Sequence, residues 1–490
     1  MVQTTLGSSS VAQVNDAPPD RERPRSSAWR RGRNRQRHDG AGNPRPTVGE
    51  SLTFTSPTRL RRGYRAGVPA PIRTALLIAA FDSQLKWCAR IRDELDSRGF
   101  ASRVVVPDTR SALSDRQVRD AGFKHIERAS WADLVTAALA SDVVVSSLAG
   151  PLTHRLSRDV AAACPPDALG PVLVSGWVGI IIEKITAGYL DRSGTDVVAV
   201  NSRDDLEHFR RTGQTLGVPT DNLVLAGLPF LSCEPRPERG GPVSTILYAD
   251  QPTVPATRHE RTYIYRRLVE HARRHPEREV LLKPRHRPGE DTFHRMAHHP
   301  ADLLADNNLP PNFRIDYTPI TDLLPRIDLL LTMSSTACLE ALDHGTRVAL
   351  ILDLGVHERH GNQVFLDSGL LRTFDQVDAD DLGSPSRAFL DSWFGGRERP
   401  APAIVVDRVE HLLDSDERPS RAVWRSAYFT GSRIVTSPDP TPAPRWMSKA
   451  WDRRVRAHGP VRGTAAYGVQ LLLPPAVVIP VRRCLAAWRG

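Results

Sequence analysis

The sequence has few cysteines, and none stands at a spacing typical of a metal or disulfide site. Its 490 residues include five cysteines, which are widely scattered: Cys88, Cys164, Cys233, Cys338 and Cys484. No pair has the CxxC spacing of zinc and redox motifs, and an odd number does not suit a disulfide framework. The sequence therefore supports neither a structural zinc site nor a disulfide scaffold, and free thiols fit a reducing compartment.

Long hydrophobic runs are also scarce. The first residues lack the apolar stretch of a secretory signal, so we expect a cytoplasmic protein. One apolar stretch, residues 465–481, is interrupted by three prolines and is short for a membrane span. It lies between arginines, which predicts either an interfacial anchor, a docked helix or a disordered tail.

Nucleic-acid-binding signatures are absent although the chain is basic. The net charge is +10 and the isoelectric point is near 9.7, a balance that invites a nucleic-acid interpretation. The excess lies in the two ends, residues 1–65 and 446–490. Basic tails also suit an anionic membrane surface, so we expect peripheral contact with the inner face of the membrane and no nucleic-acid partner. A non-catalytic binding scaffold is the alternative that these tails leave open.

The middle of the chain alternates between strand-like and helical patterns. Residues 1–70 show no apolar periodicity and are predicted to be disordered. Short buried-strand runs then alternate with amphipathic stretches on both sides of a Pro- and Gly-rich linker at residues 234–242. This alternation predicts an α/β protein with two Rossmann-like, doubly wound parallel sheets facing a cleft. The expected domains are residues 71–235 and 240–375, followed by helices packed on the core in 384–436 and a tail in 437–490.

One predicted strand-helix-strand unit contains a hydroxyl cluster. An apolar strand at 327–332 precedes Ser334, Ser335 and Thr336, which stand where the next helix needs its N-cap. Unpaired amides at a helix N-terminus form an anion site, so the hydroxyls would add donors to a phosphate. An ordinary capped helix is the alternative.

A basic cluster follows another predicted strand of the same domain. The segment 283–288 reads Lys-Pro-Arg-His-Arg-Pro, and its three cations and one imidazole suit a pyrophosphate or phosphodiester. His286 could donate a proton to a leaving phosphate near neutral pH. A solvated basic loop is the alternative, but two phosphate-suited elements on consecutive strand ends favour a nucleotide site.

These paired motifs resemble the nucleotide-sugar half of glycosyltransferases with the GT-B fold. The similarity is closer to the bacterial sialyltransferase, polysialyltransferase and capsule-polysaccharide group, which carries a His-Pro motif and a Ser-Ser/Thr motif. The chain also resembles an actinobacterial glycosyltransferase family whose N-terminal half begins Asp-Ser-x-x-Lys-Trp, as at residues 82–87 here. The resemblance covers about residues 73–375.

The resemblance implies roles for individual residues. His286 would be the motif histidine, although this chain has His-Arg-Pro where the group has His-Pro. Asp82 would be the carboxylate that deprotonates the acceptor, with an N-cap aspartate as the alternative. On the donor side the implied phosphate and nucleotide residues are Lys283, Arg285, Ser334, Ser335, Thr336 and Glu340. The candidate residues on the acceptor side are Lys86, Gly176 and Gly179. The two glycines would permit a close approach of the backbone to a ligand.

We expect neither a metal nor another cofactor. The resembling group has no bound catalytic metal, and the chain has no Asp-x-Asp motif at a strand end. The Asp-Ala-Asp-Asp run at 378–381 falls in a polar loop outside the core pattern.

Together these features predict an enzyme with two substrates, a nucleotide-sugar donor and a glycan or polysaccharide acceptor. The first domain would hold the acceptor and the second the donor, and transfer would be independent of metal. Two other enzymes are implied by the same fold: a UDP-sugar 2-epimerase, which needs no acceptor, and a polyol-phosphate transferase.

Overall fold

The computed structural model describes residues 72–108, 113–165, 167–290, 296–305 and 308–431. The predicted disordered segment 1–70, the apolar stretch 465–481 and the tail 437–490 lie outside these ranges. Among the described helices, none combines the length and the apolar character that a membrane crossing requires.

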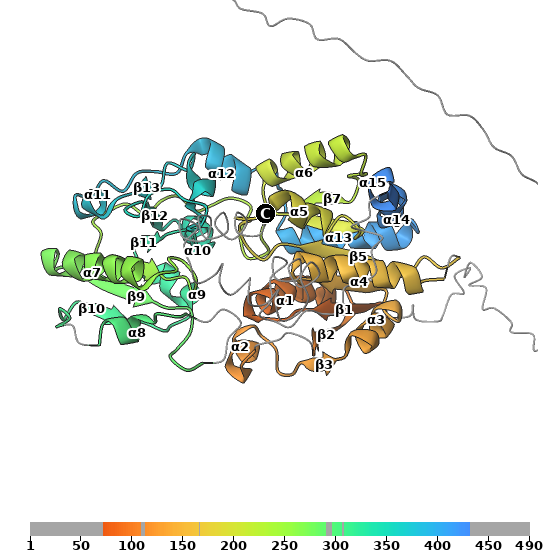
Figure 1. Cartoon of the computed structure of the whole chain (residues 1–490), viewed down its shortest axis with the longest axis horizontal. Helices are drawn as coiled ribbons and strands as arrows, with labels where there is room; N and C mark the ends of the chain where they lie inside the picture. Colours follow the sequence, from red (N-terminus) through yellow and green to blue (C-terminus); the bar gives the residue numbers. More distant parts are fainter. Residues whose placement is uncertain (1–71, 109–112, 166, 291–295, 306–307, 432–490) are drawn as a thin grey trace, which may run out of the picture. The chain divides into compact units, whose positions relative to one another are not determined.

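The first α/β region is built on a seven-stranded sheet in which every neighbouring pair is parallel (Figure 1). Its strand order is β3-β2-β1-β4-β5-β6-β7. The strands are β1 (Thr74–Ile78), β2 (Ala101–Pro107), β3 (Glu127–Ala129), β4 (Val143–Ser146), β5 (Val172–Gly176), β6 (Val197–Val200) and β7 (Leu223–Leu225). The order reverses between β1 and β4, which is the place where ligands bind in open sheets of this kind.

Helices connect these strands as the apolar pattern predicts. They are α1 (Asp82–Ser97), α2 (Asp115–Asp120), α3 (Trp131–Leu139), α4 (Gly150–Ala163), α5 (Ile185–Leu190) and α6 (Arg203–Leu216). The hydroxyls of Ser130 and Ser202 accept hydrogen bonds from the third backbone amide of α3 and α6, so these two helices begin where the caps predict. The central strands are buried on both faces, as helix-covered parallel strands must be.

The second region repeats the design with six strands in the order β10-β9-β8-β11-β12-β13, again all parallel. The strands are β8 (Thr245–Ala249), β9 (Glu279–Lys283), β10 (Phe313–Ile315), β11 (Leu329–Thr332), β12 (Arg347–Ile351) and β13 (Leu371–Arg372). The connecting helices are α7 (Arg258–Arg274), α8 (Pro300–Leu303), α9 (Ile320–Leu323), η1 (Leu324–Arg326), α10 (Ala337–Asp343), η2 (Asn362–Phe365) and α11 (Phe374–Asp378). The predicted fold class, two Rossmann-like doubly wound parallel sheets, is confirmed.

The chain then returns to the first sheet. The last helices are α12 (Arg387–Trp393), α13 (Ala401–Asp414), α14 (Ser420–Arg425) and α15 (Ala427–Gly431). Apolar side chains of α13, among them Val405 and Val409, share a core cluster with β1, β4, β5 and α1. Arg98 at the end of α1 bonds Asp407 at 2.7 Å and Glu410 at 2.6 Å. Sequence patterns predicted these helices but not that α13 covers the first sheet while α12 stays with the second region (Figure 1).

Two short elements escaped the sequence analysis. β3 is an edge strand in which only Ala129 is buried, so it carries no apolar run. α2 has six residues, too few to show a helical period. A capping box marks its start, since the Ser114 hydroxyl and the Gln117 side chain bond each other's backbone amides.

Candidate active site

An ion pair joins the ends of two strands from different sheets. Asp82 begins α1 after β1, and Arg285 lies just beyond β9. The guanidinium Nη2 of Arg285 is 3.1 Å and 3.0 Å from the two carboxylate oxygens of Asp82. Strand C-terminal ends are where ligands bind in open α/β sheets, so this pair marks the candidate active site.

Asp82 does not cap α1. The N-cap residue is Phe81, which makes no side-chain capping bond, and Asp82 is the first residue of the helix rather than its cap. Burial by itself would raise the pKa of Asp82, but Arg285 and then Lys86 outweigh it and leave the pKa below its ordinary value. The carboxyl group is therefore ionised at neutral pH, as a base must be.

Lys283 brings an unpaired cation to the same place. Its side chain is half-buried at the end of β9, and it has no hydrogen bond or ion pair with any described residue. Burial lowers its pKa to about 8, and the neighbouring charges of Lys86, Arg116 and Arg285 act in the same direction. An anion that binds between these neighbouring cations would relieve their mutual repulsion, so anion binding at this place is favourable.

A second ion pair joins the loop that follows β9 to the first domain. Arg116 of α2 donates from Nη2 to both carboxylate oxygens of Glu290, at 2.8 Å and 2.6 Å. Ser114 Oγ donates to the same carboxylate at 3.3 Å. The basic loop after β9 therefore contacts the first domain twice, through Arg285 to α1 and through Glu290 to α2. The sequence analysis missed these partners, because Arg116 and Glu290 are 174 residues apart along the chain.

His286 is engaged inside the loop. It is buried, its Nδ1 hydrogen bonds the carbonyl oxygen of Arg287 at 2.9 Å, and its Nε2 accepts from the amide of Met296 at 3.1 Å. Both ring nitrogens are therefore used by the backbone. A phosphate could reach the ring only after one of these bonds opened.

The hydroxyl cluster before α10 is also largely engaged. Ser334 is 2% exposed; its hydroxyl donates to the carbonyl of His360 at 2.6 Å, and its amide donates to the Gln251 side chain. Thr336 Oγ1 accepts from the amide of Ile180 at 3.2 Å. Ser335, whose Oγ accepts from the Ala337 amide at 3.3 Å, and Thr336 each keep a hydroxyl hydrogen that bonds no described residue.

The two predicted acceptor-side glycines serve close packing. A Cβ on Gly179 would lie 2.6 Å from Thr336 Oγ1, so only glycine lets the loop after β5 reach the start of α10. A Cβ on Gly176 would lie 2.8 Å from the Trp87 ring. Gly176 therefore faces the packing of its own sheet, whereas Gly179 joins the loop to Thr336.

Glu340 belongs to the charge cluster around the ion pair. Burial raises its pKa to about 7; Lys86 and Arg285 oppose that shift, and Asp343 adds to it. The structure therefore brings together Asp82, Lys86, Lys283, Arg285 and Glu340 from the predicted residues. Ser334 precedes Glu340 and His286 follows Arg285 in the sequence, but the donor atoms of both side chains are already used within the fold.

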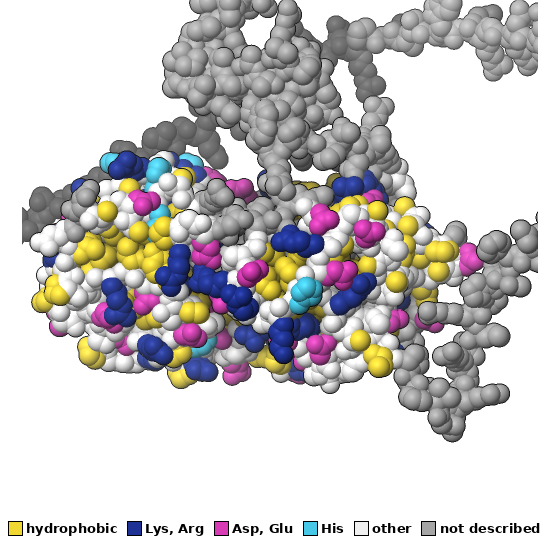
Figure 2. Space-filling view, turned by 90° about the horizontal axis from the view of Figure 1, so that it is seen from below, with side chains coloured by type: hydrophobic (Ala, Val, Ile, Leu, Met, Phe, Trp, Pro, Cys, Tyr) yellow, Lys and Arg dark blue, Asp and Glu magenta, His cyan; other side chains and the backbone are white. Residues whose placement is uncertain are grey.

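A cavity of about 850 Å³ lies beside α2. It is lined by Leu113, Asp115, Val118, Arg119, Gly122, Phe123, Lys124, His125, Ile126 and Arg128. Figure 2 views the molecule from the side on which α2 and β3 lie at the bottom of Figure 1, and Lys and Arg side chains gather there. Its volume suits a small ligand, and all of its lining residues belong to the first domain.

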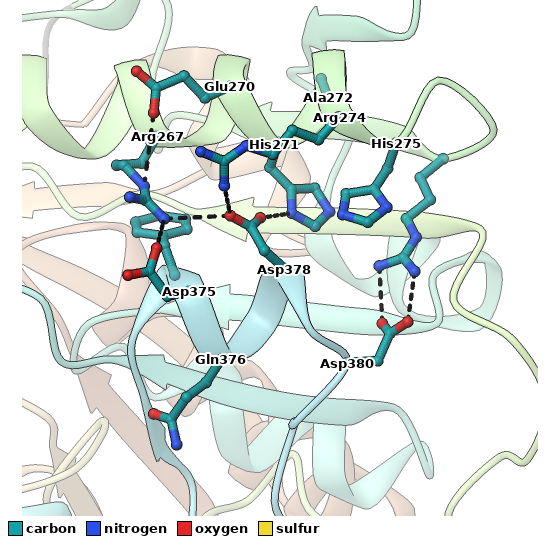
Figure 3. Close-up of polar contacts among 12 residues, drawn as sticks. Arg267, Glu270, His271, Ala272, Arg274, His275, Asp375, Gln376, Asp378 and Asp380 are labelled. Atoms are coloured by element: carbon teal, nitrogen blue, oxygen red, sulfur yellow. Dashed lines mark hydrogen bonds and ion pairs between the residues drawn. The ribbon is translucent and has the colours of Figure 1, made fainter.

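The described residues contain one group able to hold a metal, formed by His271, His275 and Asp378. Figure 3 shows it at the C-terminal end of α7. That helix leads into the start of β9, whereas Arg285 follows its end. The group therefore lies near the N-terminal end of β9, away from its C-terminal end, where Arg285 contacts Asp82, and it takes no part in that site.

Comparisons with known proteins show which solved structures the chain is similar to. A search of curated protein sequences finds no match. Similar solved structures include a UDP-N-acetylglucosamine 2-epimerase, described as putative, from Listeria monocytogenes, with 12% identity, coverage of 70% of this chain and 96% of that one, and a TM-score of 0.43. The calicheamicin glycosyltransferase CalG4 has 13% identity, coverage of 73% and 99%, and a TM-score of 0.41. The lipopolysaccharide galactosyltransferase WaaB has 10% identity, coverage of 69% and 99%, and a TM-score of 0.41.

Likenesses this distant say nothing of which reaction the chain performs. The family comparison is more direct, because residues 75–412 match one family over more than half of the chain. The chain belongs to the family described as putative glycosyltransferase, DUF6716.

Proposed function

We propose that the protein transfers a sugar from a nucleotide-sugar donor to a glycan or cell-surface polysaccharide acceptor, without a metal ion. The observation that carries this proposal is the ion pair between Arg285 and Asp82. This ion pair brings the basic loop after β9 of the second sheet into contact with the carboxylate that follows β1 of the first sheet. A transferase needs both, since one group must stabilise the leaving phosphate while another activates the acceptor.

The donor diphosphate would bind Lys283 and Arg285. The Lys283 side chain bonds no described residue, and its depressed pKa would return toward normal when a phosphate neutralised its neighbours. Ser335 would add its free hydroxyl, and Glu340 would meet the ribose. Ser334 and Thr336 would hold the start of α10 in place, because their hydroxyls already bond neighbouring loops.

Transfer would proceed by attack of an acceptor hydroxyl oxygen on the anomeric carbon of the donor sugar. The proton of that hydroxyl would pass to Asp82. The bond between the anomeric carbon and the phosphate oxygen would break, and its electron pair would remain on the nucleotide. Lys283 and Arg285 would stabilise the charge that develops there. His286 could protonate that oxygen only if its ring released Met296 or Arg287.

Asp82 and a donor phosphate would compete for Arg285. While the pair is closed, Arg285 lowers the pKa of Asp82 and so weakens it as a base. A phosphate that drew Arg285 away would raise that pKa and free the carboxylate for the acceptor. The site would therefore gain its base only when the donor is bound.

A ligand panel tests this proposal. Calorimetry against CMP, CDP, UDP, GDP and their sugars should reveal one preferred nucleotide. Arg285→Ala should weaken its binding about tenfold or more, since a charge-assisted hydrogen bond contributes about 1.5–3 kcal/mol. Arg211→Ala, at an exposed arginine of α6, is the matched control.

Product analysis then identifies the reaction. Sugar transferred only when a glycan is present supports the proposal. An altered donor sugar without any acceptor would identify an epimerase, and transfer of a polyol phosphate would identify the third enzyme class. Equal nucleotide affinity in Arg285→Ala and the wild type would place the phosphate elsewhere. The basic ends of the chain, residues 1–65 and 446–490, would bring the enzyme to a membrane-bound acceptor.

A further inference from the structure

The C-terminal end of α7 and helix α11 carry imidazole and charged groups that the proposed reaction does not use (Figure 3). His271 lies in the last turn of α7 and His275 is the C-cap residue of that helix, and their ring centroids are 4.5 Å apart. One ring nitrogen of each, and one carboxylate oxygen of Asp378, all lie within 4.8 Å of one another. We propose that this cluster binds a zinc-like transition-metal ion, with the Nε2 atoms of His271 and His275 as ligands.

His271 is already oriented as a metal ligand. Its residue is 1% exposed, and its Nδ1 lies 2.5 Å from Asp378 Oδ1, so the Nδ1 hydrogen is donated to that carboxylate. Nε2 is buried without any hydrogen-bond partner among the described residues. Metal-binding histidines usually donate their other ring N–H to a carboxylate. A metal at Nε2 would also remove the free-energy cost of the unpaired buried nitrogen.

His275 repeats the arrangement one turn later. Its Nδ1 lies 3.3 Å from Oε1 of Glu277, which leaves Nε2 for a second metal bond. In the neutral ring of His271, whose Nδ1 hydrogen is donated to Asp378, the lone pair lies on Nε2. A neutral imidazole has a lone pair ready for a metal, and imidazole suits Zn²⁺, Ni²⁺ and Cu²⁺.

The charges around the histidines also favour a cation. Four guanidinium groups are present, and each is held in ion pairs with carboxylates. The groups are Arg266, Arg267, Arg274 and Arg278, and the carboxylates are Glu270, Glu277, Asp375, Asp378 and Asp380. With neutral histidines the cluster therefore has a formal charge of −1, so a cation would enter an anionic environment. Asp378 itself would stay with Arg267, Arg274 and His271 and would act as the positioning residue.

Metal binding here would stabilise the second domain and would not enter the chemistry. The site lies at the edge of the second sheet opposite Arg285, and Asp378 attaches α11 to α7 through His271 and two arginines. An ion held by α7 and oriented from α11 would strengthen that attachment. Its loss should therefore lower thermal stability and leave nucleotide affinity unchanged.

Zinc titration of the full-length, untagged, metal-stripped chain tests the proposal. Competition with a chromophoric chelator should show one Zn²⁺ bound per chain, and Zn²⁺ should raise the Tm while Mg²⁺ should not. His275→Ala should weaken Zn²⁺ binding at least tenfold and abolish the rise in Tm. Asp378→Asn, which keeps the shape but loses the carboxylate, should weaken binding about 10–100-fold. His125→Ala, at an exposed histidine of the first domain, should bind Zn²⁺ like the wild type.

His275 is the decisive position because it is half-buried, so its loss leaves the core of α7 intact, whereas His271→Ala removes a core side chain. Absence of Zn²⁺ binding would overturn the proposal and leave the cluster as an ion-pair network. Binding that persisted unchanged in His275→Ala would overturn it too, since the ion would then sit elsewhere. A Tm rise of equal size with Mg²⁺ would contradict imidazole ligation.

Discussion

Two elements of the second domain stand at equivalent places and differ in what they can still bind. The loop after β9 and the segment before α10 each follow the C-terminal end of a parallel strand. Ser334 of the second segment is buried and donates to the carbonyl of His360, and Thr336 Oγ1 accepts from Ile180. In the β9 loop the Lys283 side chain bonds no described residue, and Arg285 extends to Asp82 of the other sheet. Equal position therefore does not give equal function, because a polar group that already bonds within the fold must break that bond before it binds a ligand.

The largest effect should come from Asp82, which the β9 loop holds through Arg285. If Asp82 is the base, Asp82→Asn should reduce turnover about 10²–10⁴-fold, the usual contribution of general-base catalysis. Nucleotide affinity should stay equal or rise, since Arg285 loses a competitor. Steady-state kinetics and calorimetry measure the two effects separately. Asp221→Asn, at an exposed aspartate, is the control, and turnover equal to the wild type in Asp82→Asn would remove Asp82 from the mechanism.

The two strand ends should respond differently to truncation. Lys283→Ala should weaken nucleotide binding about tenfold or more, because it removes an unpaired cation from the phosphate site. Ser334→Ala should leave affinity nearly unchanged and reduce the free energy of unfolding by about 1–3 kcal/mol, since the bonds to buried neighbours are lost. Calorimetry and urea unfolding compare both variants. The reverse pattern, with Ser334 controlling affinity, would show that the segment before α10 is the phosphate site.

The charge of Lys283 also predicts a pH dependence. With a pKa of about 8, Lys283 is cationic below that pH and loses its charge above it. A phosphate that restored the ordinary lysine pKa would therefore bind roughly tenfold more weakly at pH 9 than at pH 7. Nucleotide titrations across this range measure the slope. Lys283→Arg, which stays charged, should flatten it, and an equally steep slope in that variant would assign the titration to another group.

The smallest expected effect concerns the contact between Gly179 and Thr336. In Gly179→Ala the new Cβ would lie 2.6 Å from Thr336 Oγ1, so the loop or the helix start must shift at a cost of about 1–3 kcal/mol. Thermal unfolding measures that cost. The double variant with Thr336→Ala should recover part of the stability because the clashing oxygen is gone. Purely additive losses in the double variant would show that the contact is not the cause.

The sequence by itself determined the two parallel sheets and most of their strands. Apolar runs such as those at β1, β4 and β11 are long enough and buried enough to be strands wherever they pack. Side-chain caps at Ser130 and Ser202 fixed helix starts locally. Basic residues at the end of β9 were also visible, since charge and strand position need no knowledge of distant contacts.

Only the tertiary structure decided which of the polar residues stay available. His286 and Ser334 have the right chemistry for a phosphate, but their donors bond backbone groups of Arg287, Met296 and His360. Arg116 meets Glu290 across 174 residues of sequence, and α13 returns to cover the first sheet. Such contacts depend on where separate segments meet in space. Local propensity and periodicity carry no information on that, because they describe neighbours along the chain.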